Sequence, residues 1–226
     1  MKRIVILFGL MVGAAAAIAQ KPPMLDKYKE YKRSVLKAPS RQMIELKSLA
    51  PTIVYDLKYA LADNFMQRRM YPAATAKTFL RKDAAFAIEN VQKELSAAGL
   101  GLKIFDAYRP WDVSKKFWDL VHDERYVANP AHGSNHNRGT AVDLTIINLK
   151  TGKELNMGTG FDNFTDSAHH GFKNLPDEVL KNRELLRNVM EKNGFSIYNE
   201  EWWHYTFKSD TKFEVLNIPF KKFGRD

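Results

Sequence analysis

The chain of 226 residues contains no cysteine. No disulfide can therefore stabilise the fold, and no thiolate can act as a nucleophile or a metal ligand. The sequence also lacks internal repeats, low-complexity tracts and the basic stripe with interleaved aromatics that is typical of nucleic-acid binding. Its 35 Lys and Arg residues and 26 Asp and Glu residues give a net charge of +9, and the basic residues are scattered along the chain. These absences exclude a disulfide scaffold, a cysteine enzyme and a nucleic-acid partner.

The first residues have the pattern of a secretory signal peptide. Lys2 and Arg3 precede an uncharged run over residues 4–19 that ends in small residues. This run is shorter than the ~20 residues of a membrane-spanning helix. We expect a signal peptide over residues 1–19, cleavage before Gln20, and an exported protein of the periplasm or cell envelope without stable membrane insertion. The alternative is an uncleaved membrane anchor at the same place.

The remaining length and composition favour a single domain. A content of 45% hydrophobic and 12% aromatic residues is enough for one well-filled core. Residues 20–45 are rich in lysine and contain three prolines, and we expect them to form an N-terminal arm. The catalytic domain is then expected over residues 46–226.

Hydrophobic spacing predicts both helices and strands in this domain. Helices are expected over residues 83–98, from residue 111 and from residue 177, with a shorter one in the arm over residues 25–36. Strands are expected over residues 52–59, 103–108, 140–147, 195–198 and 202–207. Because these elements do not alternate as βαβ units, we predict an α+β fold with a mainly antiparallel central sheet flanked by helices.

Two short clusters together offer what a catalytic metal site requires. Such a site needs three nitrogen or oxygen ligands, an open position for water and a nearby carboxylate. The first cluster places His136 in a loop rich in glycine and asparagine, and Asp143 in the strand that follows. The second, E-E-W-W-H, places Glu201 and His204 three residues apart among bulky aromatics. Each cluster alone is weak evidence, and their combination favours a metal site.

Asp143 is the sharper indication because it lies between Val142 and Leu144 in an apolar strand. An acid is seldom buried unless it is paired or bound to a metal. The alternative without a metal, a purely structural protein, would need Arg109 or Arg138 as the partner of Asp143.

The two clusters read S-x-H-x-x-G-x-A-x-D and E-W-W-H-Y, and in this form they resemble the zinc D-alanyl-D-alanine dipeptidases of the vancomycin-resistance type. Further segments agree with that family in order and spacing. They are Y-D-L-K-Y-A at 55–60, D-N-F at 63–65, D-A-Y-R-P at 106–110, M-G-x-x-F-D at 157–162 and S-A-H-H at 167–170. The resemblance extends over residues 46–220. Residues 66–70 depart from it, so the expected rim of the substrate site is less well defined than its chemistry.

The resemblance implies a single domain of the hedgehog and DD-peptidase type, with one zinc ion at the sheet and no other cofactor. It implies that the enzyme is a metallopeptidase that hydrolyses the small dipeptide D-Ala-D-Ala with metal-activated water. The implied zinc ligands are His136, Asp143 and His204. The other implied roles are Glu201 as general base, Arg109 as the group that stabilises the oxyanion, Ser134 as a hydrogen-bonding partner of the substrate, and Asp162 as the partner of its free ammonium group.

Neighbouring residues offer alternatives to these assignments. Glu200 competes with Glu201 for the role of base, but in an extended segment the two side chains point to opposite faces and the family spacing selects Glu201. His132, His169 and His170 are further possible ligands, although a fourth protein ligand would overfill a catalytic zinc site.

Other functions remain open on the sequence alone. One alternative is a zinc carboxypeptidase or endopeptidase that acts on peptidoglycan stem peptides, and another is a zinc-dependent binding module without turnover. Cell-wall turnover, nutrient salvage and antibiotic resistance all use the same chemistry, and export favours the first two.

Overall fold

The computed structural model describes residues 22–73 and 75–224, and its centre is a five-stranded sheet in the order β3-β5-β6-β8-β7. The strands are β3 (Val54–Tyr55), β5 (Leu100–Asp106), β6 (Ala141–Asn148), β8 (Glu201–Phe207) and β7 (Phe195–Tyr198). Only the pair β3 and β5 is parallel, and the other three pairs are antiparallel. The predicted α+β class with a mainly antiparallel sheet is therefore confirmed.

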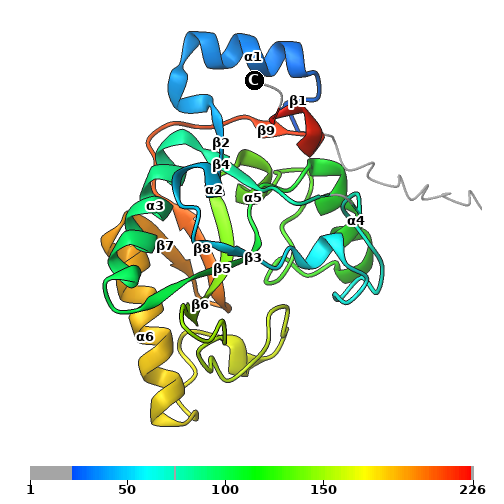
Figure 1. The fold of residues 1–226 in the computed structure, drawn as a ribbon. Coiled ribbons are helices and arrows are strands. Elements are labelled where there is room, and N and C mark those ends of the chain that lie inside the picture. Colours follow the sequence, from blue (N-terminus) through cyan, green and yellow to red (C-terminus); the bar gives the residue numbers. More distant parts are fainter. Residues whose placement is uncertain (1–21, 74, 225–226) are drawn as a thin grey trace, which may run out of the picture.

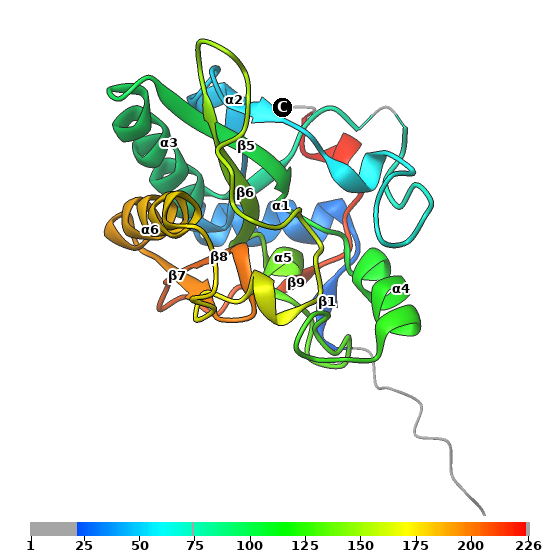
Figure 2. The ribbon, with the colours of Figure 1, turned by 90° about the horizontal axis from the view of Figure 1, so that it is seen from below.

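Two long helices, α3 (Lys82–Ser96) and α6 (Asp177–Lys192), lie side by side along the sheet (Figures 1 and 2). Alternate residues of β6 face the helices, because successive side chains of a strand point to opposite faces. The main hydrophobic core contains Val142, Leu144 and Ile146 of β6, together with Val91 of α3 and Leu186 of α6. The opposite face of β6 is therefore free to carry polar side chains.

A second hydrophobic cluster lies around α4 (Trp111–Val121), on the side of the molecule away from α3 and α6 (Figure 2). It brings Phe117 of α4 together with Tyr59 of the 3-10 turn η2 (Lys58–Ala60) and with the C-terminal segment. That segment contains β9 (Val215–Leu216) and η4 (Phe220–Lys222). The two clusters enclose the polar residues described below.

The N-terminal arm is integrated into this structure. Its helix α1 (Tyr28–Lys37) crosses the top of the molecule in Figure 1, and β1 (Met24–Leu25) pairs in parallel with β9. The turn η1 (Pro39–Arg41) leads into β2 (Met43–Glu45), which pairs with β4 (Phe79–Arg81). The predicted signal peptide lies outside the described residues. Within residues 22–73 and 75–224, no helix combines the length and apolar character that crossing a bilayer requires.

Two local predictions were wrong. Residues 52–59 were expected to be one strand, but only Val54–Tyr55 pair with β5 before the chain turns into η2. Residues 135–138 were expected to be a loop, but they form a short helix, α5 (Asn135–Arg138). Two further short elements, α2 (Leu46–Leu49) and η3 (Asp166–Ala168), also have no clear sequence pattern.

Candidate active site

Three separate elements bring His136, Asp143 and His204 to one point. His136 is carried by α5. The N-cap residue Ser134 precedes this helix and accepts a hydrogen bond from the Asn137 backbone N–H, and the C-cap residue Gly139, with φ +73°, follows it. Asp143 of β6 and His204 of β8 are directly opposite each other in the antiparallel pair. The sheet register thus fixes two of the three side chains, and the cap of α5 fixes the third.

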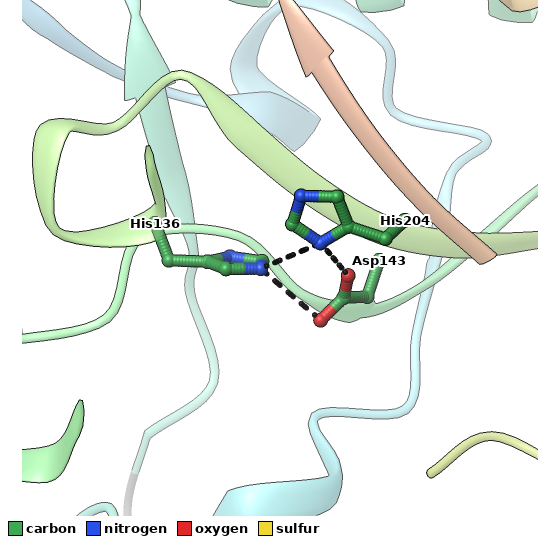
Figure 3. A group of neighbouring side chains, drawn as sticks. All are labelled: His136, Asp143 and His204. Carbon is green, nitrogen blue, oxygen red and sulfur yellow. Dashed lines mark hydrogen bonds and ion pairs between the residues drawn. The ribbon is translucent and has the colours of Figure 1, made fainter. Parts of the chain in front are cut away.

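The polar atoms of these side chains point toward one another (Figure 3). The His136 Nε2 atom lies 3.2 Å from His204 Nδ1 and 3.3 Å from Asp143 Oδ2, and His204 Nδ1 lies 3.0 Å from Asp143 Oδ1. Both His136 and Asp143 are buried, at 3% exposure each. Three donor atoms of the kind that zinc prefers are therefore gathered in one partly enclosed place.

The donor set fits a zinc ion. Ligands about 2.0 to 2.1 Å from a tetrahedral zinc lie about 3.3 Å from each other. The nearest polar atoms of the three side chains lie 3.0 to 3.3 Å apart pair by pair, with a different Asp143 oxygen facing each histidine. His136 Nδ1 is 2.7 Å from the Ala107 carbonyl oxygen, so this nitrogen carries the proton and Nε2 presents a lone pair to the cluster. Such a hydrogen bond to a backbone carbonyl is typical of histidines that bind metals.

Glu201 lies beside this cluster, and Glu200 does not. The Glu201 Oε2 atom is 3.8 Å from His204 Nδ1, and the residue is 7% exposed. Strict alternation along β8 would place Glu201 and His204 on opposite faces, but the pairing of β7 with β8 shifts register between Ile197 and Tyr198, opposite the start of β8. Glu200 precedes β8 in a turn. The structure thus brings only Glu201 to the predicted ligands.

Arg109 is held against the same cluster by Asp106. The Arg109 Nε atom donates to Asp106 Oδ2 at 2.8 Å, and Nη2 lies 3.6 Å from Asp143 Oδ2. Asp106 also accepts a hydrogen bond of 2.6 Å from the Tyr71 hydroxyl. Burial alone would lower the pKa of Arg109, but Asp106 and its neighbours raise it above the usual value. The guanidinium is therefore a fixed positive charge beside the donor cluster.

Asp162 lies in the segment between β6 and α6, next to Tyr59. The Tyr59 hydroxyl is 3.0 Å from Asp162 Oδ1 and 3.2 Å from Oδ2. The backbone of Asp162 has φ +59°, an uncommon conformation for a residue other than glycine. Burial, and then the charge of Asp143, raise the pKa of Asp162 well above its usual value. A cation bound beside Asp162 would offset the free-energy cost of ionising this carboxyl group.

These residues line one cavity of about 470 Å³ with aromatic walls. Its aromatic lining includes Tyr59, Phe65, Phe117, Tyr126, Phe164, Tyr198 and Trp203. Burial, followed by the charges of Asp143 and Asp162, raises the pKa of Glu201 well above its usual value. Perturbed acids in a cleft mark functional sites, and this group of acids around one arginine favours the binding of cations.

The remaining predicted residues have less direct positions. Ser134 lines the cavity, but its hydroxyl also caps α5. His132 is exposed at the rim, and neither His169 nor His170 is part of the donor cluster. The cavity therefore contains every predicted site residue, while the three alternative histidines lie outside the set of three donors.

Sequence reasoning assigned no role to Asp106, Tyr59 or Tyr71. Asp106 gave the same signal as Asp143, since it is an acid in an apolar strand and is fully buried in the structure. The two tyrosines gave no local signal, because their partners are 35 and 103 residues away. Only the tertiary fold reveals these contacts.

Comparison with known proteins gives consistent matches over most of the chain. The Peptidase M15 family model, described as D-Ala-D-Ala dipeptidase, matches residues 39–225. The D-alanyl-D-alanine dipeptidase of Escherichia coli (strain K12) is 35% identical over 80% of this chain and 93% of its own length. The Enterococcus faecalis (strain ATCC 700802 / V583) protein of the same name is 34% identical over 67% of this chain and 84% of its own length. The Streptomyces coelicolor (strain ATCC BAA-471 / A3(2) / M145) protein, which also has this name, is 32% identical over 72% of this chain and 89% of its own length.

Solved structures are more distant. The structure of an LD-carboxypeptidase, solved for the basis of its peptidoglycan recognition, matches 57% of this chain and 59% of its own, with 24% identity and a TM-score of 0.39. That likeness is too weak to refine the fold described above. The family model and the relatives, in contrast, extend over most of the described residues, and the chain belongs to the Peptidase M15 family of D-Ala-D-Ala dipeptidases.

Proposed function

We propose that this chain is a zinc dipeptidase that hydrolyses D-Ala-D-Ala, or a closely related short dipeptide, outside the cytoplasmic membrane. The observation that carries the proposal is the approach of His136, Asp143 and His204, whose nearest polar atoms lie 3.0 to 3.3 Å apart in each pair of side chains. Family membership supports the substrate class.

A zinc ion held by these three side chains would supply Lewis-acid chemistry and lower the pKa of a water molecule. Its three protein ligands leave a fourth position open, as catalytic zinc sites require. Trp203, which is 1% exposed, contributes an apolar side chain to the cavity wall.

Glu201 is the group proposed to move the proton. Its carboxylate is close to the donor cluster, 3.8 Å from His204 Nδ1, without belonging to the set of three donors. From this position it accepts the proton of the attacking water and then delivers it to the amine that leaves when the peptide bond breaks. The raised pKa of Glu201 suits a group that must both take up and release a proton.

Arg109 is the group proposed to stabilise the developing negative charge on the carbonyl oxygen. Asp106 already holds its guanidinium in place, so the charge needs no rearrangement during the reaction. The planar faces of Tyr59 and Phe117, with ring centroids 5.2 and 4.7 Å from the guanidinium carbon, further restrict its movement.

Asp162 is the residue proposed to select dipeptides, with Ser134 as a second hydrogen-bonding partner of the substrate. A free ammonium group would compensate the half-buried carboxylate of Asp162, whose pKa is raised. A longer peptide has an amide at that position and would leave the carboxylate uncompensated, which penalises binding. The site therefore favours free dipeptides over peptidoglycan stems. Export, if the N-terminal residues act as a signal peptide, favours a role in wall turnover or salvage.

The decisive experiment combines metal analysis of the purified chain with D-Ala-D-Ala hydrolysis before chelation, after chelation and after zinc is restored. We expect one zinc per chain and hydrolysis that disappears and returns with the metal. Release of D-alanine from a pentapeptide stem without action on free D-Ala-D-Ala would overturn the proposed substrate. A protein that binds no zinc would overturn the mechanism.

A further inference from the structure

Arg183 of α6 is a buried cation outside the cavity. It is 5% exposed, and burial lowers the pKa of its guanidinium to about 10. Among the described residues, no carboxylate forms an ion pair with it. A buried charge is costly unless it is compensated, and an apolar side chain would fill the same space at lower cost. The hydrogen bonds of Arg183 therefore indicate why a charged side chain occupies this buried position.

The guanidinium binds three backbone carbonyls of one segment. Arg183 Nε donates to the Met157 oxygen at 2.8 Å, Nη2 to the Ser167 oxygen at 2.9 Å, and Nη1 to the His169 oxygen at 3.3 Å. These carbonyls lie on both sides of Asp162 in the sequence. A single side chain of α6 thus closes residues 157–169 into a loop with Asp162 between its anchored ends.

The packing around this contact is tight at one end. Gly158 has φ +82°, and a Cβ atom at this position would lie 2.8 Å from Val179 Cγ1 of α6. The backbone therefore approaches the helix closely next to the Met157 carbonyl. The middle of the loop has its own contacts, since Trp202 Nε1 donates to Thr159 Oγ1 at 2.8 Å. Loss of Arg183 would consequently loosen the loop without removing all of its contacts.

We propose that Arg183 is a positioning residue that sets the place of Asp162 and, through it, the selection of substrates with a free amino terminus. This inference rests on the proposed function of the cavity and deepens it. The segment contains little regular structure, only the turn η3, so backbone hydrogen bonds within it cannot fix Asp162 alone. Arg183 belongs neither to the donor cluster nor to the cavity lining, and its hydrogen bonds go to the loop, so we expect its effect on the reaction to pass through the loop.

The test compares Arg183→Met with Arg187→Met, which removes the same charge from an exposed position of the same helix, where Arg187 pairs with Glu191. For Arg183→Met we expect KM for D-Ala-D-Ala to rise about tenfold with kcat changed less than about threefold, because the lost interaction acts on binding. The preference for D-Ala-D-Ala over its N-acetylated form, measured by kcat/KM, should fall about tenfold. Arg183→Lys, which keeps the charge, should restore part of this preference, and Arg187→Met should retain all of it.

Two further measurements keep the inference open to refutation. In the background of Asp162→Asn, Arg183→Met should cause no further loss of preference, because both changes act on one interaction. Amide exchange over residues 157–170 should be faster in Arg183→Met, or in Arg183→Lys if the first variant does not fold, and unchanged in Arg187→Met. Unchanged preference and unchanged exchange would overturn the role of Arg183. If wild-type protein failed to hydrolyse D-Ala-D-Ala, the proposed function would fail, whereas the exchange measurement would still test the anchoring of the loop.

Discussion

Glu200 and Glu201 are adjacent acids in very different surroundings. Glu201 is buried at the wall of the cavity, while Glu200 lies in the turn before β8 and does not line it. We predict that Glu201→Ala retains one zinc per chain but lowers kcat by about 10² to 10⁴, the usual contribution of a general base. Metal analysis and steady-state kinetics on the same preparation provide the measurement.

Glu200→Ala is the matched control, since it removes the same group one residue away. It should leave kcat within about threefold of the wild-type value, because an acid that does not line the cavity contributes little to the reaction. A normal rate for Glu201→Ala, or a large loss for Glu200→Ala, would contradict the assignment of the base.

His170 connects burial to the pH dependence of stability. Burial, followed by the charges of Arg187 and Arg183, lowers the pKa of His170 from 6.5 to about 4. Between these two values the unfolded chain binds the proton more readily than the folded chain, so the free energy of unfolding decreases as the pH falls. We predict that wild-type protein loses more thermal stability between pH 7 and pH 5 than the variant His170→Gln does, with both in chelator.

The control for this prediction is His132→Gln, which replaces an exposed histidine. Its melting temperature should show the same pH dependence as that of the wild type. The buried acids Asp162 and Glu201 are present in all three proteins, so their titration cancels in the comparison. Identical pH profiles for His170→Gln and the wild type would show that His170 does not contribute in this range.

At the scale of elements, α5 shows how a helix of four residues can place a proposed metal ligand, His136. Asn137 of α5 is fully buried, and its Nδ2 atom donates to the Arg109 carbonyl oxygen and to Ser114 Oγ, each at 2.8 Å. Its Oδ1 atom accepts from the Ser134 backbone N–H at 2.9 Å. The side-chain amide of Asn137 therefore fixes α5 relative to α4 and to the segment that follows β5.

We predict that Asn137→Ala lowers the free energy of unfolding by about 2 to 4 kcal/mol, because it leaves several buried polar groups unpaired. Zinc affinity should fall about 10- to 100-fold, as expected when the support of a ligand is lost. Chemical denaturation and competition with a zinc chelator measure the two effects. The exposed neighbour of Asn137 provides the control, and Asn135→Ala should change neither quantity appreciably.

The long elements could be predicted from sequence because their apolar periodicity is sustained. The helix expected over residues 83–98 is α3, with Ile88, Val91 and Leu95 buried, as their spacing indicates. The short elements carry too few residues for any period to be recognised. The strand Val54–Tyr55 forms only where β5 offers a partner, and α5 depends on the capping interaction of Ser134 with Asn137.

The candidate site likewise contains residues that could be predicted from the sequence and residues that could not. The place of Asp143 in the donor cluster could be predicted because an acid in an apolar strand requires a compensating partner, and the motifs indicated the two histidines beside it. The support given by Tyr59 to Asp162 and by Arg183 to the surrounding loop could not be predicted, because these contacts join distant parts of the chain. Such contacts have no local pattern, and only the packing of β6, α6 and η2 brings them together.

At the scale of the whole molecule, the donor cluster connects α5, β6 and β8, so a bound metal would tie His204 to Asp143 and His136, which lie 61 and 68 residues earlier in the sequence. Since zinc at this site binds only the folded chain, it should raise stability with its free concentration, by about 4 kcal/mol at a thousandfold excess over Kd. We predict that the melting temperature rises steadily with zinc and falls on chelation. The variant His204→Ala, which removes one donor, should show little of this dependence at the same zinc concentrations. An equal zinc-dependent rise in both proteins would place the stabilising metal elsewhere, and no rise in the wild type would mean that the three side chains do not hold it.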